Sequence, residues 1–237
     1  MVTELTEWLP SVARPGDLIW FYFAGHGSQA WDLNRDEPDG LDETTCPADA
    51  MRGNTETDIL DDELAVWLDQ LPTDNVIVVW DKCHAKSSTR AVSPFARPRS
   101  LGRNVEEDVA PPLGFEVDMN APTEEPEDGG PPNPKVLEIS ASQADEVALD
   151  AAFPNREGQG HTCGGAFTTP FVRNLWNAQR GTSYEDILEK TRADMKRSRF
   201  RQEPSIDQKD LKDRPLFWLA GDALATAFSF DMELPST

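Results

Sequence analysis

Two short, uninterrupted apolar runs constrain the fold of this chain more than any other feature. LIWFYF occupies residues 18–23 and VIVVW occupies residues 76–80. Each run is too short for a buried helix, and a short apolar run of this kind is typical of a strand covered on both faces. Helical patterns alternate with the apolar runs, so the sequence predicts an α/β layer fold with a mostly parallel sheet.

Apolar spacing and composition predict the other elements. Helices are expected at residues 3–12, 58–70, about 168–179 and 183–197, and further strands at residues 135–140 and 216–219. Residues 25–50 are rich in Asp, Gly and Pro and are predicted to form a loop.

The 237 residues most simply form a single domain in two parts. Residues 94–134 end in PTEEPEDGGPPNP, which has almost nothing to bury, and we expect a flexible linker there. This linker separates a larger part, residues 1–93, from a smaller part, residues 135–237.

The charge of the chain restricts its partners. There are 43 acidic and 22 basic residues, for a net charge of −21. Such a field repels nucleic acid and anionic membranes and favours cationic peptides or divalent metal, although it also serves simply to keep a protein soluble. No stretch approaches the roughly 18 apolar residues that span a bilayer, and the acidic, amphipathic N-terminus is not a signal peptide. Three cysteines do not describe a disulfide framework, so a cytoplasmic location is expected.

Reactive side chains follow both apolar runs. His26 lies three residues beyond the first run, and Cys83 lies three residues beyond the second. The carboxyl ends of parallel neighbours meet at one edge of a sheet, so both side chains are expected in one crevice. An imidazole there can take the thiol proton and later protonate a leaving amine. The sequence therefore predicts a Cys–His dyad.

The glycines beside His26 suit the same chemistry. Gly25 and Gly27 allow the backbone to approach a substrate closely, and the N–H groups of Gly27 and Cys83 could hold an oxyanion. Zinc binding by the cluster Cys46, Cys83, His84 and His26 is the alternative, but these spacings match no usual zinc pattern.

The motifs resemble a known family. YFAGHGSQ, followed later in the chain by a strand and DKCH, resembles the His and Cys motifs of metacaspases and their bacterial caspase-like relatives, which read Y-S-G-H-G and D-x-C-H-S-G. Most of the remaining chain also follows the family pattern in order, through DEPDGLDETTCPAD, LDDELAVWLDQLP, KVLEISASQADEVALD, GGAFTTPFVRNL and SYEDILEKTRADMKR.

This resemblance implies a caspase-like three-layer sandwich and a cysteine endopeptidase. His26 would be the general base and acid, and Cys83 the nucleophile. Asp81 matches a family position that lines an acidic S1 pocket, the pocket for the residue before the cut bond, and that selects Arg or Lys there. Ala24 stands where the family has a Ser that also lines S1. The implied substrates are peptides or proteins with basic P1 residues, and cleavage after Asp is disfavoured because an acidic pocket repels it.

The resemblance also implies regulation. Asp42, Asp61 and Asp62 match carboxylates that calcium-dependent members use, although Asp61 and Asp62 equally suit the first turn of a helix. No cofactor is required for the chemistry itself, and Ca²⁺ is expected only as a stimulator. The linker matches a region that is often cut in the family, and its arginines suit self-cleavage: Arg90, Arg97, Arg99 and Arg103.

Several departures from the family pattern bear on activity. Ala85 and Lys86 replace the usual Ser and Gly after the Cys–His pair, and Lys82 adds a cation that could lower the thiol pKa or compete for Asp81. The first strands of the usual fold have no counterpart here, so we expect LIWFYF to form an exposed apolar edge. Either a partner chain covers this edge, or the chain is a fragment, or the protein is no longer a protease. These departures favour an alternative function, a catalytically impaired module that binds or regulates a partner. A different hydrolase or an acyl transferase is a third reading.

Overall fold

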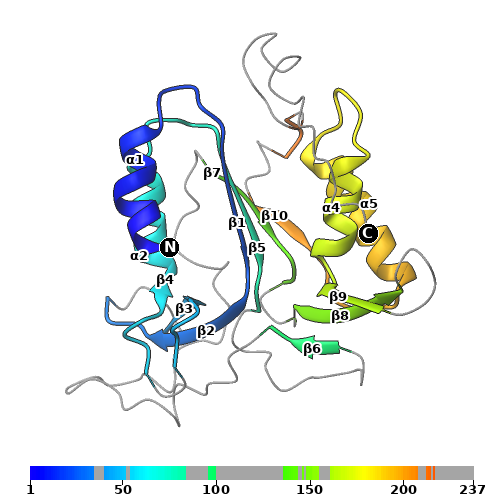
Figure 1. Cartoon of the computed structure of the whole chain (residues 1–237), viewed down its shortest axis with the longest axis horizontal. Coiled ribbons are helices and arrows are strands. Elements are labelled where there is room, and N and C mark those ends of the chain that lie inside the picture. Colours follow the sequence, from blue (N-terminus) through cyan, green and yellow to red (C-terminus); the bar gives the residue numbers. More distant parts are fainter. Residues whose placement is uncertain are drawn as a thin grey trace.

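A four-stranded sheet forms the centre of the molecule (Figure 1). The computed structural model describes residues 1–34, 40–51, 54–83, 96–99, 136–143, 146, 148–154, 161–207, 212–214 and 216. The two apolar runs form β1 (Ile19–Ala24) and β5 (Val76–Asp81), and the predicted third strand is β7 (Val136–Ser140). These three strands are parallel, and β10 (Ser205–Asp207) joins β7 antiparallel. The predicted mostly parallel sheet is confirmed.

Helices cover both faces of this sheet. The first face carries the π-helical turn η1 (Glu4–Trp8), α1 (Leu9–Val12) and α2 (Asp61–Asp69), and the second carries α4 (Thr168–Trp176) and α5 (Tyr184–Arg197) (Figure 1). Alternate residues of β5 feed the two resulting cores. Val76 and Val78 pack with the α2 side, and Ile77 and Val79 pack with α4 and α5. All six β5 residues are buried, as a strand between two helical layers requires. The structure has the expected caspase-like three-layer α/β architecture.

The helix boundaries have local causes. α5 begins with a reciprocal capping box, in which Ser183 Oγ accepts from the Asp186 N–H at 3.0 Å and Asp186 Oδ2 accepts from the Ser183 N–H at 2.8 Å. The helix predicted from residue 58 begins later, at Asp61. Residues 59–60 instead form β4 (Ile59–Leu60), because their backbone pairs with another strand.

The prediction of a loop over residues 25–50 was wrong. β2 (His26–Trp31) and β3 (Leu41–Cys46) pair antiparallel, and β4 extends the same small sheet. The Asp, Gly and Pro residues that gave this segment its loop-like composition are concentrated in residues 32–40, between the two strands.

A second small sheet was not predicted. It contains β6 (Ala96–Pro98), β8 (Leu149–Pro154) and β9 (His161–Gly165), in the order β6-β8-β9. β6 belongs to the segment for which we expected a linker, and most of that segment lies outside the described residues. Of the strand predicted at residues 216–219, only Leu216 is described, and it lies in a turn.

β1 is the outer strand of the central sheet within the described part of the chain. It pairs with β5 over all six residues, and β5 separates it from β7. Ile19 is buried, whereas the aromatic residues that follow it are only half-buried. The strand is therefore less covered than its apolar sequence alone predicts. None of the helices described here is both long enough and apolar enough to cross a bilayer.

Candidate active site

The ends of β1 and β5 bring the two predicted motifs together. In the parallel register, Ala24 lies beside Asp81, and the Gly25 N–H donates to the Asp81 carbonyl oxygen at 3.2 Å. The chain then enters β2 at His26 on one side and reaches Cys83 on the other. The two motifs therefore meet at one edge of the sheet, as parallel neighbours require.

Cys83 and His26 differ in their exposure. The Cys83 side chain is fully buried, and its thiol donates to the Ala148 carbonyl oxygen at 3.1 Å. His26 is exposed at the start of β2. In the part of the chain that the structure describes, no hydrogen bond joins the His26 ring to the Cys83 thiol. The thiol thus has a backbone carbonyl as its hydrogen-bond acceptor.

Burial sets the protonation state of Cys83. It raises the pKa of the thiol to about 11, although hydrogen bonds to the backbones of Arg99 and Ala148 act in the opposite direction. A thiol with this pKa is about one part in 10⁴ thiolate at pH 7. In this arrangement Cys83 is protonated.

Two backbone N–H groups converge on one carbonyl oxygen. The N–H groups of Gly27 and Cys83 each donate to the carbonyl oxygen of Arg99 at 3.1 Å. These are the same two N–H groups that the sequence predicts as donors to an oxyanion. The close approach of β2 to the Cys83 backbone requires a glycine at position 27, because a Cβ atom there would lie 2.0 Å from the Cys83 carbonyl oxygen.

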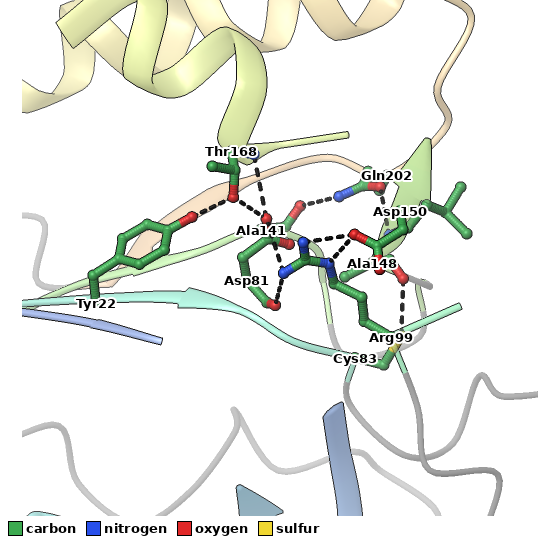
Figure 2. Close-up of polar contacts among 10 residues, drawn as sticks. Tyr22, Asp81, Cys83, Arg99, Ala141, Ala148, Asp150, Thr168 and Gln202 are labelled. Carbon is green, nitrogen blue, oxygen red and sulfur yellow. Dashed lines mark hydrogen bonds and ion pairs between the residues drawn. The ribbon is translucent and has the colours of Figure 1, made fainter. Parts of the chain in front are cut away.

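The Asp81 carboxylate lies in a buried polar pocket. Its Oδ2 atom accepts from the Thr168 hydroxyl and, at 3.3 Å, from the Thr168 N–H at the beginning of α4. Tyr22 contacts the same hydroxyl (Figure 2). Burial raises the pKa of Asp81, whereas the Arg99 guanidinium and the bonds from Thr168 favour its charged form. Burial also raises the pKa of Tyr22, to about 12.

The Arg99 guanidinium fills this pocket. Its Nη1 atom donates to the Asp81 carbonyl oxygen at 2.8 Å and lies 3.4 Å from Asp81 Oδ2. Its Nε and Nη2 atoms donate to Asp150 Oδ1 at 3.0 and 2.7 Å. Figure 2 shows the guanidinium between the two carboxylates. The pocket therefore binds a guanidinium through two acidic side chains and one backbone carbonyl.

Gly165 forms a wall of the same pocket. A Cβ atom there would lie 2.2 Å from Asp81 Oδ2 and 2.9 Å from Arg99 Nη2. Only a residue without a side chain leaves room for the guanidinium and the carboxylate together.

Comparison with known proteins identifies the architecture. The sequence profile of the caspase domain, peptidase family C14, matches residues 1–215. The chain belongs to this family. It is therefore related to cysteine peptidases, and the strand-end His and Cys motifs described above lie within the matched caspase domain.

Individual relatives agree with this assignment. Metacaspase-1 of Arabidopsis thaliana is 30% identical over 188 residues, which is 78% of this chain and 46% of the relative. Metacaspase-2 of the same plant is 30% identical over 198 residues, 78% of this chain and 42% of the relative. The chain thus spans less than half the length of these metacaspases. A crystal structure of a Geobacter sulfurreducens protein shares the fold, with a TM-score of 0.54 and 19% identity over 92% of this chain and 77% of that one.

Lys82 of the caspase domain faces away from Asp81. Its ammonium donates to the Thr44 carbonyl oxygen at 3.1 Å and lies 5.3 Å from the centroid of the Trp80 ring. Lys82 therefore does not compete for the Asp81 carboxylate. Ala24 lies beside Asp81 in the register, as S1 lining would require, and its side chain is exposed. Ala85 and Lys86 lie outside the described residues.

The three carboxylates expected to bind Ca²⁺ lie on two elements. Asp42 is buried in β3, and Asp61 and Asp62 begin α2, where Asp62 Oδ2 accepts from Asn34 at 2.6 Å. Burial raises the pKa of Asp61, and nearby Lys82 opposes this shift. Within the described ranges, no three His, Cys, Asp or Glu side chains form a group that could hold a metal ion. Among the described residues, Asp42, Asp61 and Asp62 thus form no metal cage, and the alternative zinc cluster includes His84, which lies outside the described residues.

Sequence reasoning missed part of the pocket. It named Arg99 only as one of four candidate cleavage sites, and it did not single out Asp150, Ala148 or Gly165. Asp150 ends the segment KVLEISASQADEVALD and Gly165 is the second residue of GGAFTTPFVRNL, so both lie in segments that resemble the family. What brings them to Asp81 is the pairing of β8 with β6 and β9, which no period in the sequence indicates.

Proposed function

We propose that this chain is a cysteine endopeptidase that cuts peptide bonds after Arg or Lys. One observation carries the proposal: a backbone carbonyl accepts from the Gly27 and Cys83 N–H groups while the guanidinium of the same residue lies against Asp81. A substrate cut after Arg needs both contacts at the same time. The membership of a cysteine peptidase family supports the same conclusion.

The chemistry assigns a role to each residue. His26 accepts the Cys83 thiol proton, and the thiolate forms a bond to the carbonyl carbon of P1. The oxygen gains negative charge between the Gly27 and Cys83 N–H groups. The carbon–nitrogen bond then breaks, and His26 gives its proton to the leaving amine. Water hydrolyses the resulting thioester to a carboxylic acid and the free thiol.

Specificity follows from the charges in the pocket. Asp81 is completely buried, and the Asp150 side chain is 46% exposed. A basic P1 side chain compensates both carboxylates, whereas an acidic one adds a third negative charge. Substrates are therefore peptides or proteins with Arg or Lys at P1.

Regulation by Ca²⁺, by self-processing and by a partner chain on β1 belongs to the same proposal. The half-buried aromatic residues of β1, at the outer position in the described sheet, suit a covering partner. Ca²⁺ stimulation rests on the resemblance to calcium-dependent metacaspases, and no step of the chemistry above requires the ion.

A fluorogenic Arg peptide tests the proposed activity. The purified protein is incubated with this peptide and with its Asp counterpart, with and without Ca²⁺, beside a Cys83→Ala control. Release of the fluorophore from the Arg peptide alone, by the wild-type protein or by its Arg99→Ala variant and lost in the control, is the expected result. If well-folded protein and its Arg99→Ala variant both leave the peptide intact, the chain is not a peptidase with this specificity, and the alternative of a non-catalytic binding module gains support.

A further inference from the structure

Residues 96–99 lie along the active site as an added strand. β6 pairs antiparallel with β8, with Pro98 opposite Leu149, and the Arg99 N–H continues the pairing to the Ala148 carbonyl oxygen at 2.9 Å. An extended peptide that adds a strand to a sheet edge is a general mode of peptide binding, in which backbone bonds give affinity and one pocket gives specificity. Here the added strand belongs to the chain itself.

All three functional groups of Arg99 are bound by the site. Its N–H bonds to β8, its carbonyl oxygen accepts from the Gly27 and Cys83 N–H groups, and its guanidinium lies between Asp81 and Asp150. Arg99 is 8% exposed. Arg97, two residues earlier on the same strand, is exposed and serves as a comparison. The site therefore binds Arg99 specifically, and a nearby basic residue such as Arg97 does not take its place.

We propose that the substrate cleft is filled by the chain's own residues 96–99, with Arg99 in the position of the P1 residue of a substrate. The assignment of Arg99 as P1 rests on the proposed function. The internal strand excludes other peptides, because it occupies the oxyanion donors, the S1 pocket and the β8 edge together. The peptide bond that follows Arg99 is accordingly the one presented to Cys83.

The strand also shares a hydrogen-bond acceptor with the nucleophile. The Ala148 carbonyl oxygen accepts from both the Arg99 N–H at 2.9 Å and the Cys83 thiol at 3.1 Å. The Cys83 side chain packs with the buried core on the α4 and α5 side of the sheet, and the strand bonds to the acceptor of its thiol. Departure of residues 96–99 would free this side of Cys83 for water and for added reagents.

Alkylation of Cys83 tests this occupancy without requiring catalysis. Iodoacetamide labelling of each cysteine is followed by peptide mass spectrometry in wild type, Arg99→Ala and the matched control Arg97→Ala. We expect Cys83 to react at least about tenfold faster in Arg99→Ala, because the thiol becomes accessible and ionises more easily. Arg97→Ala should react like wild type. Equal rates in wild type and Arg99→Ala would overturn the proposal.

Two readouts separate occupancy from loss of structure. Removal of Arg99 leaves Asp81 buried without a cation, which could loosen the fold. The alkylation rate of buried Cys46 detects such loosening, because Cys46 should react slowly in every variant that remains folded. Acetyl-arginine amide should refill the pocket and slow Cys83 labelling in Arg99→Ala, but have no effect in the Asp81→Asn/Arg99→Ala double variant. Fast labelling of Cys83 that acetyl-arginine amide does not slow would contradict occupancy of S1.

The outcomes also distinguish this inference from the proposed activity. Fast, arginine-protected labelling in Arg99→Ala without hydrolysis of an Arg peptide would support internal occupancy and reject the peptidase. Hydrolysis of the Arg peptide by wild type and Arg99→Ala at the same rate, with unchanged labelling, would support the peptidase and reject internal occupancy.

Discussion

The backbone of Gly27 lies against the carbonyl group of Cys83 so closely that a Cβ atom on Gly27 would lie 2.0 Å from the Cys83 carbonyl oxygen. The Cys83 carbonyl oxygen belongs to the backbone, so it cannot rotate away as the end of a side chain could. This contact fixes the separation of the two N–H groups that donate to the Arg99 carbonyl oxygen. The two proposed oxyanion donors are therefore held by a steric fit that only glycine permits.

A Gly27→Ala substitution should disable the site. The added methyl group must push β2 away from Cys83, at a cost of about 1–3 kcal/mol of stability. Because one oxyanion donor moves, we expect a loss of about 10²-fold or more in kcat on the Arg peptide. Ser28→Ala is the matched control on the same strand, because the buried Ser28 hydroxyl has no hydrogen-bond partner among the residues that the structure describes. Wild-type kcat in Gly27→Ala would contradict the proposed role of this N–H group.

The two carboxylates of the pocket should contribute unequally to the binding of a basic P1 residue. Asp81 is fully buried, and about half of the Asp150 side chain reaches solvent, where water screens its charge. In the Arg99→Ala background, Asp81→Asn should lower kcat/KM on the Arg peptide by about 30-fold or more, and Asp150→Asn by less than about tenfold. The measurement is kcat/KM for each variant. The opposite order of effects would place the specificity determinant on β8.

The central sheet could be predicted from the sequence because burial dominates its composition. VIVVW and the run before His26 have no polar residue in their interior, and only a strand between two covering layers satisfies so short an apolar run. The same logic brought His26 and Cys83 to one edge of the sheet. The same argument did not predict β2 and β3, because these strands are short and polar. Their conformation is decided by pairing with each other and not by their composition.

The cation in the pocket could not be predicted for a different reason. Arg99 and Asp150 are 51 residues apart, and both reach Asp81 through the small β6-β8-β9 sheet. Nothing in the local sequence distinguishes Arg99 from Arg97, which is exposed on the same strand. Only the register of β6 on β8 decides which arginine enters the pocket.

The reactivity of Cys83 should depend steeply on pH. Burial raises the pKa of its thiol to about 11, and the thiolate is the reactive form. In wild type, the iodoacetamide rate at Cys83 should therefore rise about tenfold per pH unit above pH 7 and reach no plateau below about pH 10. In Arg99→Ala, where water reaches the thiol, the plateau should begin at lower pH. The labelling rate of exposed Cys163 in the same sample measures how the reagent itself behaves at each pH. A plateau of the wild-type Cys83 rate near pH 8 would show that this thiol is not buried in solution.

The peptide bond after Arg99 should be the first that the enzyme cuts, and the cut should be intramolecular. The carbonyl of this bond already lies between the two oxyanion donors, so no second molecule has to bind. Intact-mass spectrometry should find fragments that correspond to residues 1–99 and 100–237, formed with first-order kinetics at a rate independent of protein concentration.

Three variants make this last prediction specific. Cys83→Ala should abolish the cut because it removes the nucleophile, and Arg99→Ala should abolish it because it removes the P1 side chain. Arg97→Ala should leave it at the wild-type rate, since that side chain lies in solvent. First cleavage after Arg90 or Arg103, or a rate that rises in proportion to protein concentration, would mean that the site cuts a neighbouring molecule and that Arg99 is held there for a structural reason.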